Sequence, residues 1–185
     1  MPFEQTGFDG LLLFAPVVYN DDRGFFFESF NETTFRNAGI QPFVQDNQSF
    51  SKHGVIRGLH YQLAPYAQSK LVRVISGEIL DVVVDIRKGS PTYGKIFNAV
   101  LSAENRKQLF IPKGFAHGFS VLSPTAEVLY KCDTFYNKES EAGILYNDAT
   151  LNIDWQINAA AAIVSEKDIL LPAFDTCRNN FVFAE

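Results

Sequence analysis

Short runs of β-branched and aromatic residues recur along most of the chain, and turn-forming residues separate them. The clearest are residues 71–75 and 79–86, which flank the turn Ser76-Gly77-Glu78. Similar runs occur at residues 24–30, 54–61, 96–101, 108–111, 118–122 and 127–130. Runs of this kind predict strands, and many short strands at close spacing predict a sandwich or barrel. The 18 phenylalanines suit an interior between two sheets, because each ring buries a large apolar area.

Helical patterns are scarce. Residues 31–38 are the best candidate, with Asn31 as the N-cap and Gly39 as the stop. Residues 158–167 contain four consecutive alanines and predict a second short helix. Because 185 residues suit one domain and no repeat or linker is visible, we predict a single all-β domain over residues 1–185 with small helical additions.

Composition and charge exclude several classes of protein. Sixteen Lys and Arg residues against 21 Asp and Glu give a net charge of −5, which argues against nucleic-acid binding. The N-terminal segment has no basic region, so we expect no signal peptide. The apolar run 11–19 is far shorter than the roughly 20 residues that a membrane helix needs. Cys132 and Cys177 are isolated and fit free thiols, so we expect a cytoplasmic protein.

Two of the three histidines lie in unusually polar segments of the predicted strands. One segment is Arg57-Gly58-Leu59-His60-Tyr61-Gln62, followed by Lys70, and the other is Ile111-Pro112-Lys113-Gly114-Phe115-Ala116-His117-Gly118-Phe119. Because residues two apart share a face of a strand, His60 and Gln62 should face one way. Arg57 should face the other way unless a bulge at Gly58 turns it. His53 lies in a predicted turn and receives no role.

The spacing Pro112-x-Gly114-x-x-His117 resembles the second motif of the cupin superfamily, whose members are jelly-roll β-barrels or sandwiches. Metal-binding cupins supply His-x-His and then Glu in their first motif, whereas this chain has His60-Tyr61-Gln62 and then Lys70. An ammonium group has no lone pair for a metal, and two histidines with Gln and Lys make a poor transition-metal site. We therefore predict no catalytic metal.

An ordered set of motifs between about residues 10 and 170 resembles the dTDP-4-dehydrorhamnose 3,5-epimerase family. The motifs are Asp22-Arg23-Gly24-x-Phe26-x-Glu28, Gln45-Asp46-Asn47-x-Ser49, the His60 segment, Lys70-Leu71-Val72, Asp81-Val82-x-Val84-Asp85-Ile86-Arg87, the His117 segment and Ser165-Glu166-Lys167-Asp168. The resemblance implies an isomerase that acts on dTDP-4-dehydro-6-deoxy-D-glucose without a redox cofactor. It also implies a homodimer with sites near the subunit interface.

The chemistry of such a substrate asks for a base, an acid and a cation. The hydrogens on C3 and C5 are both α to the C4 ketone, so removing either one gives an enolate. His60 suits the base, because imidazole is the side chain whose unperturbed pKa lies nearest neutrality. Tyr130 suits the acid on the opposite face, with a pKa that a neighbouring cation can lower. Lys70 suits the enolate oxygen. The resemblance assigns Asp168 as the partner of His60, in the manner of a catalytic triad.

The remaining predicted residues bind substrate. The resemblance places Tyr136 against the thymine ring and His117 near the diphosphate or sugar. Guanidinium groups match a diphosphate well, which suits Arg57 and Arg23. The polar residues expected to hydrogen-bond the base and sugar are Glu28, Gln45 and Asn47, with Glu141 and Lys167 as further carry-overs from the family. Because family members share residues across the dimer, Arg23 and Glu28 are candidates for the neighbour's pocket.

Other functions fit part of the pattern. Related enzymes epimerise only C5 or C3, or move the ketone from C4 to C3; Tyr130 favours epimerisation, because inversion needs an acid on the opposite face. A non-catalytic cupin-like module that binds sugar nucleotides would not need His60, Lys70 and Tyr130 together. A metal-dependent oxygenase is disfavoured by the absence of His-x-His.

Overall fold

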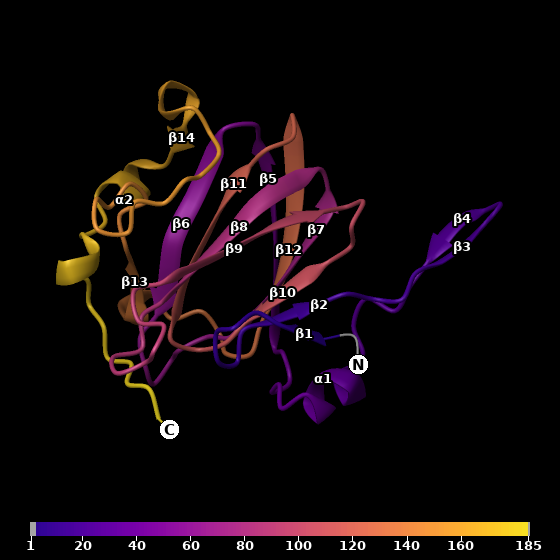
Figure 1. Ribbon diagram of the computed structural model, residues 1–185, viewed down its shortest axis with the longest axis horizontal. Coiled ribbons are helices and arrows are strands. Elements are labelled where there is room, and N and C mark those ends of the chain that lie inside the picture. The colour runs from indigo at the N-terminus through magenta and orange to yellow at the C-terminus, as the bar shows by residue number, and fades with distance from the viewer. Residues whose placement is uncertain (1–2, 185) are drawn as a thin grey trace.

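Two β-sheets lie face to face in the computed structural model, which describes residues 3–184 (Figure 1). The first sheet has the order β1 (Phe3–Gln5), β2 (Leu12–Phe14), β10 (Gln108–Ile111), β7 (Lys70–Ser76), β12 (Thr125–Cys132) and β5 (Gln45–Lys52). The second has the order β13 (Glu141–Gly143), β6 (Val55–Gln62), β11 (Phe115–Val121), β8 (Glu78–Asp85) and β9 (Ile96–Ser102), and β14 (Ile163–Val164) pairs with β6. The all-β prediction is confirmed.

Strand β8 is buried on both faces, which explains why its residues 79–84 are apolar except for Asp81. Ile79 and Val83 face the core between the two sheets. Leu80 and Val82 face outward, where Trp155 and the rest of the C-terminal part of the chain cover them. Strands that are covered on both sides are apolar throughout instead of alternating. The second sheet is therefore the middle layer of the molecule.

Helix α1 (Glu32–Asn37) is confirmed with the predicted cap, since the Asn31 side chain accepts hydrogen bonds from the backbone N–H groups of Thr33 and Thr34. Its Phe35 packs on the outer face of the first sheet. Three short 3-10 helices are η1 (Lys138–Ser140), η2 (Ala159–Ala161) and η3 (Phe174–Thr176). No helix within residues 3–184 is long and apolar enough to cross a membrane.

The predicted helix over residues 158–167 is wrong. After η2 the chain forms β14, in which the Ile163 N–H donates to the Gly54 carbonyl at 2.8 Å. The Ser165 side chain then caps a new helix, α2 (Glu166–Ile169). Pairing with β6 and this cap outweigh the helix propensity of the alanines.

One predicted strand needs correction, and one strand was not predicted. Residues 24–30 form only a short strand, β4 (Gly24–Phe26), which pairs with β3 (Tyr19–Asp21) in a separate hairpin. Strand β5 was not predicted, because its sequence QDNQSFSK is almost wholly polar.

A bulge in β6 turns Arg57 and His60 to the same side. His60 pairs with His117 and Arg57 pairs with Phe119, so three steps along β6 match two along β11. Because His117 and Phe119 are two apart and share a face, their partners share it too. Gly58 has φ +116°, and a Cβ there would lie 2.6 Å from the Gly118 Cα atom. The bulge that was considered from sequence is therefore present, and it requires glycine.

We predict that Gly58→Ala is much more destabilising than Gly89→Ala. Gly89 also has positive φ (+87°), but a Cβ there would meet no atom within 4 Å. The free energy of unfolding of the Gly89→Ala control should therefore fall by only about 1–2 kcal/mol, the cost of a positive φ in alanine. Gly58→Ala should lose the same backbone cost and, in addition, about 1–3 kcal/mol from overpacking against Gly118. Urea unfolding measures both, and equal losses would show that the close approach of β6 and β11 is not the constraint.

Candidate active site

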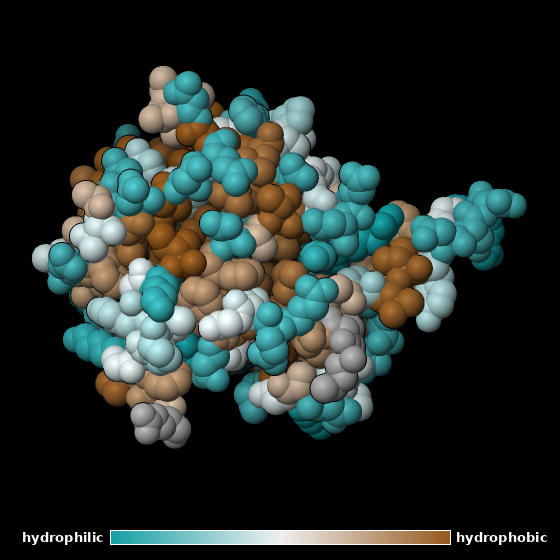
Figure 2. All heavy atoms as spheres, in the orientation of Figure 1, coloured by the Kyte–Doolittle hydropathy of each residue, from teal (hydrophilic) through white to brown (hydrophobic). Residues whose placement is uncertain are grey.

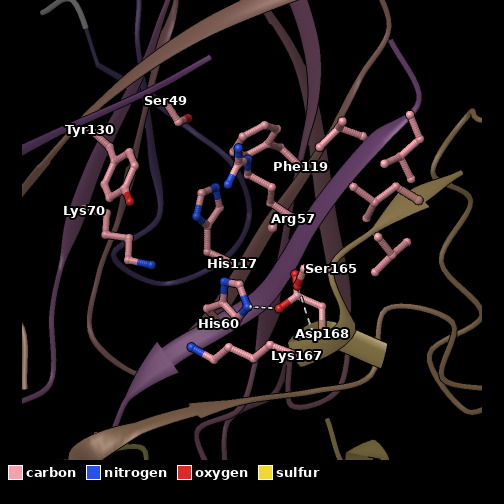
Figure 3. A pocket seen from close by; sticks show the side chains of 15 residues that line it. Ser49, Arg57, His60, Lys70, His117, Phe119, Tyr130, Ser165, Lys167 and Asp168 are labelled. Atoms are coloured by element: carbon pink, nitrogen blue, oxygen red, sulfur yellow. Dashed lines mark hydrogen bonds and ion pairs between the residues drawn. The ribbon is translucent and has the colours of Figure 1, made fainter. Parts of the chain in front are cut away.

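A cavity of about 520 Å³ opens between the two sheets (Figure 3). A smaller cavity of about 160 Å³ adjoins it and shares His60, Lys70 and Tyr130. The predicted residues that line the larger cavity are Arg57, His60, Lys70, His117, Tyr130, Lys167 and Asp168. Those that line only the smaller one are Gln45, Asn47, Tyr136 and Glu141. Strands and a helix far apart in sequence thus bring together all the predicted site residues except Arg23 and Glu28.

His60 and Asp168 form a hydrogen-bonded pair on the wall of the second sheet. His60 Nε2 lies 2.7 Å from Asp168 Oδ1 (Figure 3). The Gly58 backbone N–H donates to Asp168 Oδ2 at 3.3 Å. Burial alone would raise the pKa of Asp168, but the hydrogen bonds and charge of His60, with those of Gly58 and Ser165, hold this pKa below its ordinary value. An ionised Asp168 fixes the imidazole and can stabilise its charged form.

Lys70 and Tyr130 lie on the facing wall, from β7 and β12 of the first sheet. Lys70 Nζ lies 5.9 Å from the centre of the Tyr130 ring. Burial lowers the pKa of Lys70, although the Cys132 thiol and the carboxylates of Asp81 and Glu141 oppose the shift. Burial raises the pKa of Tyr130, and the nearby Arg57 opposes this only in part. The expected lowering of the phenol pKa by a cation is therefore outweighed, and Tyr130 holds its proton at neutral pH.

A second histidine–aspartate pair lies beside the first. His117 Nε2 is 2.9 Å from Asp81 Oδ2, and the register places His117 directly across from His60. Asp81 was quoted in a sequence motif, but it received no role. A signal was available, because Asp81 is the one acidic residue within the apolar run 79–84.

The rim of the smaller cavity is held by polar contacts. Glu141 accepts hydrogen bonds from the Tyr136 hydroxyl at 3.0 Å and from Lys167 Nζ at 2.5 Å. Gln45 Nε2 donates to Asn47 Oδ1 at 3.1 Å, and the Tyr136 backbone N–H donates to Gln45 Oε1 at 3.0 Å. These contacts link Lys167, which lines the larger cavity, to four residues that line the smaller one: Gln45, Asn47, Tyr136 and Glu141.

Arg23 and Glu28 lie away from both cavities. Arg23 lies in the turn of the β3–β4 hairpin, and its side chain is 90% exposed and pairs with Asp21 at 2.5 Å. Glu28 accepts a hydrogen bond from Asn31 Nδ2 at 3.1 Å. The hairpin projects from the body of the molecule (Figure 1), and Figure 2 shows apolar side chains exposed on this arm. These include Tyr19, Phe25 and Phe26.

Sequence reasoning gave no role to several further residues that line the larger cavity, among them Ser49, Phe119 and Ser165. Ser49 continues the alternation that begins with Gln45 and Asn47, so recognising β5 as a strand would have placed all three on one face. Within residues 3–184, no group of three or more His, Cys, Asp or Glu side chains is placed to hold a metal ion.

Comparison with known proteins agrees with this geometry. A family model described as dTDP-4-dehydrorhamnose 3,5-epimerase matches residues 5–176. The chain is 54% identical to the dTDP-4-dehydrorhamnose 3,5-epimerase of Shigella flexneri, over 89% of this chain and 91% of that protein.

Two solved structures extend the likeness. The dTDP-4-dehydrorhamnose 3,5-epimerase of Elizabethkingia anophelis superimposes with a TM-score of 0.90 at 49% identity, covering 94% of this chain and 96% of that one. The dTDP-6-deoxy-D-glucose-3,5-epimerase of Legionella pneumophila, solved with dTDP-4-keto-L-rhamnose, gives 0.89 at 47% identity, covering 94% and 93%. The predicted cupin-type fold is confirmed, and the chain belongs to the dTDP-4-dehydrorhamnose 3,5-epimerase family.

Proposed function

We propose that this protein is an isomerase that inverts C3 and C5 of dTDP-4-dehydro-6-deoxy-D-glucose and yields dTDP-4-dehydro-L-rhamnose. Membership of the epimerase family supports this reaction. The observation that carries the mechanism is the division of groups between the two sheets. His60 with Asp168 stands on one wall of the cavity, and Tyr130 with Lys70 stands on the facing wall.

The first step is removal of a proton α to the ketone. His60 takes the hydrogen from C3 or C5, and the electrons of the C–H bond move to the C4 oxygen as an enolate. Asp168 stabilises the imidazolium that forms. Because C3 and C5 both adjoin C4, a single cation near the C4 oxygen serves both enolates. Lys70 supplies that charge from a buried position, where a fixed cation acts strongly.

The second step delivers a proton to the opposite face of the sugar. Tyr130 holds its proton at neutral pH and faces His60 across the cavity, so it protonates the carbon from the other side. The enolate electrons re-form the C4 carbonyl, and the carbon is inverted. Proton removal and return leave the oxidation state of the sugar unchanged, so the reaction needs no redox cofactor.

The two adjoining cavities suit the two ends of a nucleotide sugar. The sugar occupies the region around His60, Lys70 and Tyr130, which both cavities share. Arg57 and Lys167 bind the diphosphate as charged donors. The nucleoside lies along the smaller cavity, with Tyr136 against the base. Gln45, Asn47, Glu141 and His117 complete the predicted binding set.

A homodimer completes the predicted site. Arg23 and Glu28 reach neither cavity of their own chain, and they belong to an exposed arm with apolar side chains. Exposed apolar patches of this kind mark interaction surfaces. In a two-fold dimer the arm of each subunit would close the pocket of the other.

We also infer a single domain and a cytoplasmic location. Three apolar clusters pack against the two sheets, one between them and one on the outer face of each. Because both sheets contribute to the cluster between them, they form one folded unit. Cys132 and Cys177 are both free, which fits a reducing compartment.

Incubation of the 4-keto substrate in D2O should give deuterium at both C3 and C5, read by NMR. His60→Ala should abolish this exchange, because it removes the proposed base. His53→Ala is the matched control, since His53 lies in the β5–β6 turn and its Nδ1 contacts the Leu122 carbonyl at 3.0 Å. Exchange by His60→Ala at the wild-type rate would refute the assignment of the base.

The same spectra separate the alternatives. Deuterium at only one carbon would indicate a single-site epimerase. Movement of the carbonyl from C4 to C3 would indicate a ketoisomerase. Tight binding of dTDP with no exchange at either carbon would indicate a sugar-nucleotide-binding module.

Mixed dimers test the exchange of residues between subunits. A His60→Ala chain paired with an Arg23→Ala chain should contain one complete site, because Arg23 of the first chain serves the pocket of the second. Random pairing should therefore restore about one quarter of the wild-type sites. His60→Ala paired with Asp168→Asn is the control; these residues touch within one chain, so no complete site can form. Equal activity of the two mixtures would exclude a shared site.

A further inference from the structure

Asp81 is a buried carboxylate that is only partly satisfied. Its side chain is 0% exposed and lies in β8 among apolar neighbours, facing the space between the sheets. Oδ2 contacts His117 Nε2 at 2.9 Å, whereas Oδ1 is buried without a hydrogen-bond partner among residues 3–184. A buried charge is costly unless an opposite charge compensates it. A neutral imidazole offers one hydrogen bond and no charge, so this arrangement favours a charged His117.

The charged and titratable groups around His117 come from five elements. They are Arg57 and His60 on β6, Lys70 on β7, Asp81 on β8, Tyr130 on β12, and Lys167 and Asp168 on α2. Asp168 is engaged by His60, and Lys167 is engaged by Glu141. Asp81 is therefore the carboxylate left to compensate His117, and it also lies close enough to Lys70 to favour the ammonium form.

The hydrogen bond to Asp81 orients the His117 ring. Because Nε2 is turned to Asp81, the other ring nitrogen, Nδ1, remains for the cavity that His117 lines. His117 pairs directly with His60 across the strands. Side chains at paired positions lie about 5 Å apart at Cβ, so the ring stands next to the base and hence next to the reacting carbons.

We propose that Asp81 is a positioning residue that holds His117 as an imidazolium, whose Nδ1–H joins Lys70 in binding the C4 oxygen as it becomes an enolate. The inference rests on the proposed epimerase function and adds a second positive donor to it. Asp81 touches no substrate and acts through His117. The pocket then contains two histidine–carboxylate pairs with opposite tasks: His60 begins neutral and takes a proton, whereas His117 begins charged and keeps its proton.

NMR of labelled histidine tests the charge of His117 without any assay of activity. The chain has three histidines, so His53→Ala and His60→Ala variants assign the spectrum. We expect both nitrogens of His117 to carry protons at pH 7 in the wild-type protein. In Asp81→Asn, loss of the negative charge should move the titration of His117 to lower pH. A neutral His117 at pH 7 in the wild-type protein, or an unchanged pKa in the variant, would overturn the proposal.

Kinetics then test the contribution of the pair to catalysis. Asp81→Asn should lower kcat about tenfold to a hundredfold, with KM changed by less than about threefold, because the lost interaction belongs to the enolate. The alkaline limb of the pH profile should move to lower pH, since the weaker imidazolium is lost earlier. A purely structural role would lower the rate equally at all pH values, and a loss confined to KM would assign the pair to binding; either result refutes the proposal.

A double-mutant cycle isolates the route through His117. In a His117→Gln background, Asp81→Asn should lower kcat much less than in the wild-type background, because only its effect on the charge of Lys70 remains. A full additional loss would contradict the positioning role. Deuterium exchange by the wild-type protein tests the proposed function, so its absence would refute that function and leave the NMR result to decide the state of His117.

Discussion

The close approach of β6 and β11 at Gly58 and Gly118 underlies the architecture of the site. A Cβ on either glycine would lie 2.6 Å from backbone atoms of the facing strand. The bulge that this contact permits turns Arg57 and His60 into the same cavity. It also leaves the Gly58 N–H free to bind Asp168, so the irregularity in the strand and the carboxylate behind the base are parts of one arrangement. Packing of two glycines thus determines where the His60 side chain stands.

Opposed sheets solve a problem that is specific to inversion. Epimerisation needs a base and an acid on opposite faces of one carbon, and a sandwich supplies side chains from two walls across one cavity. The chain has a net charge of −5, although its proposed substrate is an anion. The structure resolves this conflict locally, because Arg57, Lys70 and Lys167 line the same cavity. Arg23, which the sequence also suggested for this cluster, belongs to the projecting arm.

The sequence predicted which residues line the cavities better than it predicted the strands that carry them. Runs such as 79–86 predicted strands because burial of both faces leaves mostly apolar residues, whereas β5 was not predicted because its sequence is almost wholly polar. The alanines at 159–162 predicted a helix that does not form, because the pairing of β14 with β6 is a tertiary interaction that local helix propensity does not reflect. Asp81 showed its chemistry only when the fold placed it behind His117, a contact between residues 36 positions apart.

The central claim is that protons leave and arrive on opposite faces through different groups. Tyr130→Phe tests it most directly, with deuterium exchange and product formation followed together by NMR in D2O. The account predicts that His60 still removes and returns protons on its own face, so the substrate gains deuterium without inversion. Inverted product at the wild-type rate would contradict the account, because the opposite-face acid would then be another group. Loss of exchange as complete as in His60→Ala would contradict it as well, because Tyr130 would then act in proton removal.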